Sequence, residues 1–267
     1  MKNKTVLFLI ILFGAIGLLY STRLGGRHNG LLTNLVSLIP PFIAFVYAWR
    51  ASRTYEHNNK HGKALLLMTF GLLLWFMGEF GLFLFQFVVD INPYPSIADI
   101  SFLAGYPLIW AGLVMEIRIN KSSLKDFNQY IQFLIALIMG MLVLAVLYFG
   151  VFLAYAPGQP IMNNLVAMSY GLGDLMLIAP TLYVLKMAVD YRGGKLFISW
   201  ALIMIALLLN LLGDVYFAIY RDAYTALEWP YNMIDIVWGL SYILFAYSFF
   251  NTAMTIKSVR TQLKKSS

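Results

Sequence analysis

Long runs of apolar residues, separated by short polar connections, recur eight times along the chain. A transmembrane helix needs about 20 mostly apolar residues, and each run is close to or above this length. The runs are residues 5–20, 31–49, 64–89, 97–117, 130–154, 164–187, 196–219 and 232–253. The connections contain turn-forming residues such as Asn92-Pro93-Tyr94-Pro95 and Trp229-Pro230. The pattern therefore predicts an all-α fold, a polytopic transmembrane helical bundle of about eight spans that forms one integral membrane domain over residues 1–267.

The composition agrees with this prediction. Hydrophobic residues make up 61% of the 267 residues and charged residues only 12%, whereas about 25% of the residues in a soluble domain are charged. A soluble fold of this length has too little interior to bury so much apolar surface. The chain has no cysteine, which excludes disulfides and thiolate-ligated metal or haem sites. No nucleophile–base pair or phosphate-binding loop occurs, so we expect no cofactor and no enzymatic activity, and the sequence leaves metal binding open.

The positions of the basic residues predict the orientation of the chain. They concentrate at the N-terminus, in every second connection and at the C-terminus, and short cytoplasmic loops retain Lys and Arg. This group contains Lys2, Lys4, Arg50, Arg53, Lys60, Lys63, Arg118, Lys121, Lys125, Lys186, Arg192, Lys195, Lys257, Arg260, Lys264 and Lys265. The alternate connections hold only Arg23, Arg27 and Arg221. We therefore predict a cell-membrane protein with both termini in the cytoplasm and a basic cytoplasmic tail over residues 254–267.

The same residues argue against a nucleic-acid partner. They are spread over five membrane-edge segments and form no single patch, so the expected partner is the lipid bilayer.

The first run has an alternative interpretation, because Met1-Lys2-Asn3-Lys4 followed by an apolar stretch is also typical of a signal peptide. Since Tyr20-Ser21-Thr22-Arg23 lacks a small-x-small cleavage site, we favour a retained helix. Cleavage would leave seven spans in the same orientation.

Two parts of the chain resemble each other, at about residues 1–126 and 127–256. Gly78-Glu79 in the third run corresponds to Gly213-Asp214 in the seventh. Further along, Asp99 and Tyr106 in the fourth run correspond to Asp235 and Tyr242 in the eighth. Because each part would contain four spans, both would have the same orientation in the membrane. The sequence thus predicts two parallel four-helix repeats related by a pseudo-two-fold axis along the membrane normal.

Five acidic residues lie inside the predicted spans, in the half of the membrane that the basic residues assign to the outside. They are Glu79, Asp99, Asp174, Asp214 and Asp235. A charge within a bilayer costs roughly 3 to over 10 kcal/mol, so these residues should face the bundle interior and be neutralised by a proton, a cation or hydrogen bonds. Two have a structural interpretation, because Ser96-x-x-Asp99 and Asn232-x-x-Asp235 fit helix capping boxes. The other three either hold helices together by hydrogen bonds or are functional, and Asp174 is the strongest functional candidate.

The remaining ionisable residues indicate less. His57 and His61 have the spacing of helical metal ligands, but they lie in a polar connection, which favours a solvated position. Lys186 lies at the inner end of the sixth run, where a lysine that extends to the membrane surface is more typical than one that binds retinal.

The segment Tyr94-Pro95-Ser96-Ile97-Ala98-Asp99, followed by Gly105-Tyr106-Pro107-Leu108, is similar to a pattern of prokaryotic multi-helix membrane domains. Those domains precede diguanylate cyclase or histidine kinase modules and are regarded as sensory inputs. The resemblance extends from the third to the eighth run and implies a sensory function. Only a basic tail of about 14 residues follows the eighth run, so the resemblance implies a stand-alone relative that would act on a separate signalling protein.

Three functional hypotheses follow. The first is a receptor-like sensory protein that binds a small cation or an amphipathic molecule in an outward-facing acidic pocket between the two repeats. The residues expected to form this pocket are Glu79, Asp174, Asp214, Trp75, Tyr170, Tyr216 and Trp238. The second is a proton- or cation-coupled transporter that uses the same acids, and the third is a structural or assembly protein without a ligand. The apolar inner halves of the third and seventh runs favour a pocket that opens on one side only.

Overall fold

The computed structural model describes residues 2–23, 29–55, 59–91, 94–120, 128–190 and 196–266. Over these ranges the chain forms helices and no β-strand. The elements in chain order are α1 (Lys2–Thr22), α2 (Asn29–Ser37), α3 (Ile39–Ser52), α4 (Lys60–Phe87), α5 (Ile97–Ile119), α6 (Gln129–Ala145), η3 (Val146–Leu153), α7 (Ile161–Asp190), α8 (Phe197–Thr225), η4 (Tyr231–Ile234) and α9 (Asp235–Ser266). The predicted all-α fold is confirmed.

Eight helical segments in the described ranges are long and apolar enough to cross a membrane, so the chain is a multi-pass helical membrane protein. They are Lys4–Thr22, Gly30–Ser52, Lys60–Phe87, Ile97–Ile119, Gln129–Leu153, Ile161–Val189, Phe197–Thr225 and Tyr231–Leu263. Each matches one predicted run. Two of them are composite. The second consists of α2 and α3, which meet at Leu38 just before Pro40 and Pro41, and the fifth continues from α6 into the π-helix η3.

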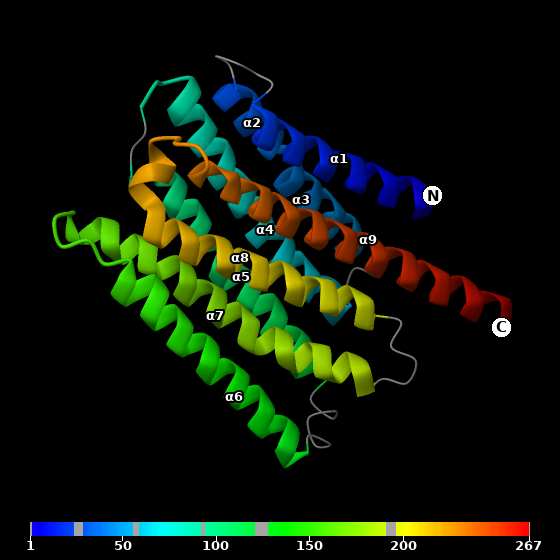
Figure 1. The fold of residues 1–267 in the computed structure, drawn as a ribbon. Coiled ribbons are helices and arrows are strands. Elements are labelled where there is room, and N and C mark those ends of the chain that lie inside the picture. Colours follow the sequence, from blue (N-terminus) through cyan, green and yellow to red (C-terminus); the bar gives the residue numbers. More distant parts are fainter. Residues whose placement is uncertain are drawn as a thin grey trace.

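The helix ends alternate between the two ends of the bundle (Figure 1). Both termini lie at one end, together with the last residues of α3, α5 and α7 and the first residues of α4, α6 and α8. The opposite end, here called the distal end, carries residues 88–91, 94–96, 154–160 and 226–230. This arrangement agrees with an even number of membrane crossings.

Six helices form the centre of the bundle. The helix α4 packs against α3 and α5, α8 packs against α7 and α9, and two further contacts, α5 with α7 and α3 with α9, join these groups. The helix α1 lies against α9. The helix α6 lies at the edge of the bundle, where Ile135 is its one buried side chain, as expected for a span that is largely surrounded by lipid.

Two helices run further than the apolar pattern predicts. The helix α8 continues beyond residue 219 to Thr225, with non-helical backbone angles at Tyr220. As a result Arg221, which we expected in an outer connection, lies inside α8 and is only 4% exposed. The expected basic tail is not a separate segment either, because α9 continues to Ser266.

Several contacts repeat between the predicted halves of the chain. A Cβ atom added at Gly78 would lie 2.7 Å from the ring of Phe102, and one added at Gly213 would lie 2.4 Å from the ring of Trp238. In both pairs a glycine one residue before an acid allows an aromatic ring of the next helix to contact the backbone. The predicted duplication and its rotation axis stay predictions.

Candidate functional site

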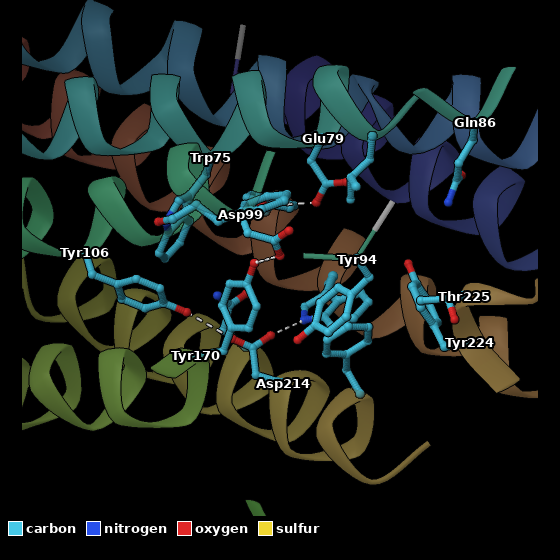
Figure 2. Close-up of a pocket in the computed structure, with 16 residues that line it drawn as sticks. Trp75, Glu79, Gln86, Tyr94, Asp99, Tyr106, Tyr170, Asp214, Tyr224 and Thr225 are labelled. Atoms are coloured by element: carbon cyan, nitrogen blue, oxygen red, sulfur yellow. Dashed lines mark hydrogen bonds between the residues drawn. The ribbon is translucent and has the colours of Figure 1, made fainter. Parts of the chain in front are cut away.

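A cavity of about 90 Å³ lies among α4, α5, α7, α8 and α9 and extends toward the distal end (Figure 2). It has room for several water molecules, since a water needs about 10–15 Å³ of such space. Its lining is mainly aromatic and carboxylic: Trp75, Glu79, Leu82, Gln86, Tyr94, Asp99, Phe102, Tyr106, Tyr170, Asn210, Asp214, Phe217, Tyr224, Thr225, Trp238 and Tyr242. A smaller cavity of about 20 Å³ adjoins it, shares Glu79, and reaches Asp235.

The structure brings five of the seven predicted pocket residues together around this cavity, namely Trp75, Glu79, Tyr170, Asp214 and Trp238. The other two lie elsewhere. Asp174 is fully buried and does not line the cavity. Tyr216 lies on another face of α8, where its ring is 4.7 Å from the ring of Tyr220.

Asp214 is held by donors from two neighbouring helices. The hydroxyl of Tyr106 donates to one carboxylate oxygen at 2.9 Å, and Nε1 of Trp238 donates to the other, also at 2.9 Å. Tyr106 reaches this position because Gly173 leaves its ring room against α7, where an added Cβ would lie only 2.8 Å from the ring. The Asp214 carboxyl is thus fixed at the cavity wall by groups from α5 and α9.

Asp99 has two roles. As the sequence predicts, it forms a capping box with Ser96: the Ser96 side chain accepts from the Ala98 amide, and the Ser96 amide donates to Asp99 at 2.6 Å. Its second oxygen accepts a hydrogen bond from the hydroxyl of Tyr170, which extends from α7. The first residues of α5 are therefore tied to α7 beside the cavity.

The second predicted capping box is wrong. Asn232 lies within the 3₁₀ turn η4, which has no side-chain cap, and its buried side-chain oxygen has no hydrogen-bond partner among the described residues. Asp235 instead accepts hydrogen bonds from the hydroxyls of Tyr20, at 2.5 Å, and Tyr224, at 2.8 Å. The Tyr20 hydroxyl is also 2.9 Å from that of Ser37, so Asp235 links α1, α2, α8 and α9.

Glu79 has the fewest protein partners of the cavity acids. Among the described residues its carboxyl group accepts one hydrogen bond, from the hydroxyl of Tyr242 at 3.3 Å. A carboxylate has about four acceptor positions, so several remain for another donor or a cation. Glu79 also borders both the main and the adjoining cavity.

Apolar side chains close the cavity on the side of the two termini. Leu72 and Met68 of α4, Leu207 of α8, and Phe245 and Phe249 of α9 are all at most 2% exposed and belong to the hydrophobic core there. At the distal end the lining contains Gln86, Tyr94 and Thr225. The cavity in this conformation therefore faces one end of the bundle only.

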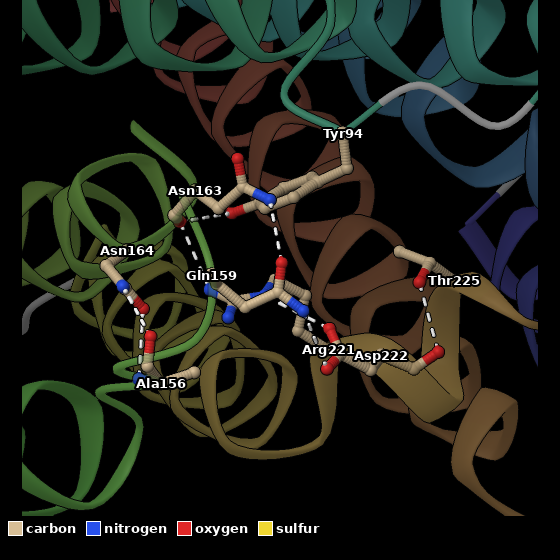
Figure 3. A network of polar contacts seen from close by, with 8 residues as sticks. All are labelled: Tyr94, Ala156, Gln159, Asn163, Asn164, Arg221, Asp222 and Thr225. Atoms are coloured by element: carbon tan, nitrogen blue, oxygen red, sulfur yellow. Dashed lines mark hydrogen bonds and ion pairs between the residues drawn. The ribbon is translucent and has the colours of Figure 1, made fainter. Parts of the chain in front are cut away.

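A polar network holds the distal rim together (Figure 3). Nη1 of Arg221 donates to the carbonyl of Asn163 at 3.1 Å, and the Tyr94 hydroxyl donates to the same carbonyl at 3.3 Å. The guanidinium also lies 5.6 Å from the centre of the Tyr94 ring. Burial, with the nearby Asp99 charge, raises the pKa of the Tyr94 hydroxyl, which therefore remains a donor. Asn164 forms two hydrogen bonds with the backbone of Ala156.

At the opposite end of the bundle, His61 corrects one interpretation from the sequence. His57 lies outside the described residues, but His61 is not simply solvated. Its Nδ1 is 2.8 Å from the carboxylate of Glu116, a residue of α5 that is 5% exposed, and its ring stacks on Tyr55. The pair joins the start of α4 to the end of α5. Within the described ranges no group of three or more His, Cys, Asp or Glu residues is arranged to hold a metal ion.

Comparisons of the chain with models of known protein families, with curated proteins and with solved structures found no match. The class of the protein, a polytopic α-helical membrane protein, therefore rests on its own sequence and fold.

Proposed function

We propose that this is a receptor-like sensory membrane protein that binds a small, positively charged ligand in the cavity beside Glu79 and Asp214. The observation that supports the proposal most is the composition of the wall: Glu79, Asp99 and Asp214 are surrounded by the rings of Trp75, Tyr106, Tyr170 and Trp238. Aromatic faces attract cations, most strongly where water is excluded, and a carboxylate adds a counter-charge. Such walls suit an amine or quaternary ammonium group, either alone or as the head of an amphipathic molecule.

The one-sided cavity favours a receptor over a transporter. A transporter needs a route for its substrate to both sides of the membrane, whereas apolar side chains such as Met68, Leu207 and Phe249 fill the bundle between the cavity and the end with the termini. A flux assay in liposomes separates the two, because a receptor binds its ligand without moving it across the bilayer.

The orientation of the chain is part of the proposal. The Lys and Arg pattern favours both termini in the cytoplasm of the cell, which would direct the cavity to the outside. A ligand would then arrive from outside, and the helical basic segment at the end of α9 would be available to a separate signalling protein inside.

The test is a thermal-stability screen of the purified protein against amines, quaternary ammonium ions and metal cations. A ligand that binds only the folded state raises the melting temperature, and the rise grows with the ligand concentration relative to the dissociation constant. We expect a stabilising amine whose effect is lost in Glu79→Gln and Asp214→Asn, because an amide carries no charge. Asp90→Asn is the matched control, since Asp90 is exposed at the distal end of α4 and does not line the cavity.

The third hypothesis, a structural protein without a ligand, predicts a different result. If the acids only hold helices together, their amides form nearly the same hydrogen bonds, and the variants should respond to every compound as the wild type does. A screen in which no compound distinguishes the wild type from both variants would rule out the proposed ligand site.

A further inference from the structure

Asp174 is buried without a hydrogen-bond partner. Its side chain is 0% exposed in the middle of α7, and neither carboxylate oxygen has a partner among the described residues. The side-chain oxygen of Asn210 on α8 is also buried and unpartnered. Buried polar atoms are almost always paired, since an unpaired one costs about 1–3 kcal/mol and a charged one more. Three acceptor oxygens without a donor therefore indicate something that the protein itself does not supply.

The groups that face Asp174 carry no positive charge. They are Asn210 and Asp214 from α8, Tyr106 from α5 and, further away, Tyr242 from α9. The hydroxyls of Tyr106 and Tyr242 are already donated to Asp214 and Glu79. The buried guanidinium of Arg221 is two helical turns from Asp214 and donates to the Asn163 carbonyl. No basic side chain of the described residues thus neutralises Asp174.

Two neighbouring carboxylates cannot both be ionised here without a positive charge between them. At about 4 Å and an effective dielectric constant of about 20, two negative charges repel by about 4 kcal/mol, in addition to the cost of burying each. Either one acid holds a proton, or a small cation lies among the oxygens. Both sources provide the same chemistry, which is one positive charge.

We propose that Asp174 and Asp214, with Asn210, form a buried site that binds one positive charge, a proton or a sodium ion, between α7 and α8. The site adjoins the cavity, because Asn210, Asp214 and the neighbouring Tyr106 all line it, with Asp174 buried behind them. A cation would enter from the cavity past Asp214. A proton or sodium ion bound here cancels one negative charge of the Asp174–Asp214 pair. It therefore weakens the attraction of the cavity for an organic cation, a consequence that rests on the proposed function.

The experiment has two arms, both with the full-length protein in nanodiscs. In the first, infrared spectra at neutral pH are recorded for the wild type, Asp174→Asn and Asp90→Asn, with ¹³C-labelled aspartate to assign the bands. If the site holds a proton, the wild type and Asp90→Asn show the C=O band of a protonated aspartic acid, and Asp174→Asn lacks this band. In the second, melting temperatures are compared in sodium and in N-methyl-D-glucamine at equal ionic strength. A bound sodium ion raises the melting temperature of the wild type and of Asp90→Asn, but not of Asp174→Asn.

The site is supported if Asp174→Asn lacks either the C=O band of protonated aspartate or the rise in melting temperature in sodium that the wild type shows. The proposal is overturned if the spectra show no protonated aspartate and sodium stabilises the wild type no more than Asp174→Asn. If Asp174→Asn does not fold, Asp214→Asn replaces it, because both acids share the charge. Glu79→Gln separates this proposal from the organic ligand site, since it should abolish stabilisation by amines while leaving the aspartate band or the sodium effect in place.

Discussion

Replacement of Gly213 by alanine should disturb the cavity wall without adding or removing a polar group. The new Cβ would lie 2.4 Å from Nε1 and 2.8 Å from Cε2 of Trp238. Since ordinary contacts begin at about 3.4 Å, the indole must move by about 1 Å, which breaks its 2.9 Å hydrogen bond to Asp214. Overpacking of this kind costs about 2 kcal/mol, and a hydrogen bond in a membrane bundle contributes about 1 kcal/mol. Alanine regains about 0.8 kcal/mol of helix propensity, so we expect a net loss of about 2 kcal/mol.

Two glycines of the chain provide matched controls. Gly78→Ala would meet the ring of Phe102 at 2.7 Å, but Phe102 has no side-chain hydrogen bond to lose, so the loss should be about 1 kcal/mol smaller. An added Cβ at Gly140 on α6 would meet no atom within 4 Å beyond its chain neighbours and the backbone of its own helix, and Gly140→Ala should stabilise by about 0.5–1 kcal/mol. Reversible unfolding in SDS–detergent mixtures measures all three variants. If Gly213→Ala proves as stable as Gly140→Ala, the packing of Trp238 against α8 described above is wrong.

Three further measurements concern the orientation, the His61–Glu116 pair and the duplication. Reporters fused after Ser267 and within residues 121–125 should be active in the cytoplasm and one within residues 158–162 outside, and an external C-terminus would overturn the proposed orientation. His61→Ala should destabilise the protein by about 1–3 kcal/mol, because it leaves the buried Glu116 unpaired, and adding Glu116→Gln should restore part of this loss in the same unfolding assay. In an experimental structure, α4 and α5 should superpose on α8 and α9 by rotation about an axis near the membrane normal, with Glu79 on Asp214; an axis in the membrane plane would refute the duplication.

The spans could be predicted because membrane crossing depends on length and composition, which the sequence displays directly. The ends of the helices could not, because α8 continues through the polar residues Arg221 and Asp222. Two partners of that arginine, the carbonyl of Asn163 and the ring of Tyr94, come from elsewhere in the chain. The failed cap at Asn232 has a similar cause. The box pattern fits a simple helix start, whereas the chain forms a 3₁₀ turn first, and tyrosines of α1 and α8 bind Asp235.

The positions of the acids along the spans follow directly from the sequence, whereas their direction around each helix depends on the spacing of the residues beside them. The cavity residues of α8, Asn210, Asp214 and Phe217, follow one another at spacings of four and three and share one face. Spacings of three and four, in that order, relate Asp235, Trp238 and Tyr242 in α9, and Asp99, Phe102 and Tyr106 in α5. Tyr216 falls off this face, as observed. This spacing was the signal that would have revealed Tyr106, Asn210 and Tyr242 as cavity residues.

An experimental density map of the protein purified from its native membrane would show whether the cavity beside Glu79 and Asp214 holds a cationic ligand. We expect density in the cavity that is not part of the chain, within hydrogen-bonding or ion-pair distance of Glu79 and in contact with the ring of Trp238. A cavity closed by the rings of Trp75, Tyr170 and Trp238, with each carboxyl group paired only to protein donors, would contradict it.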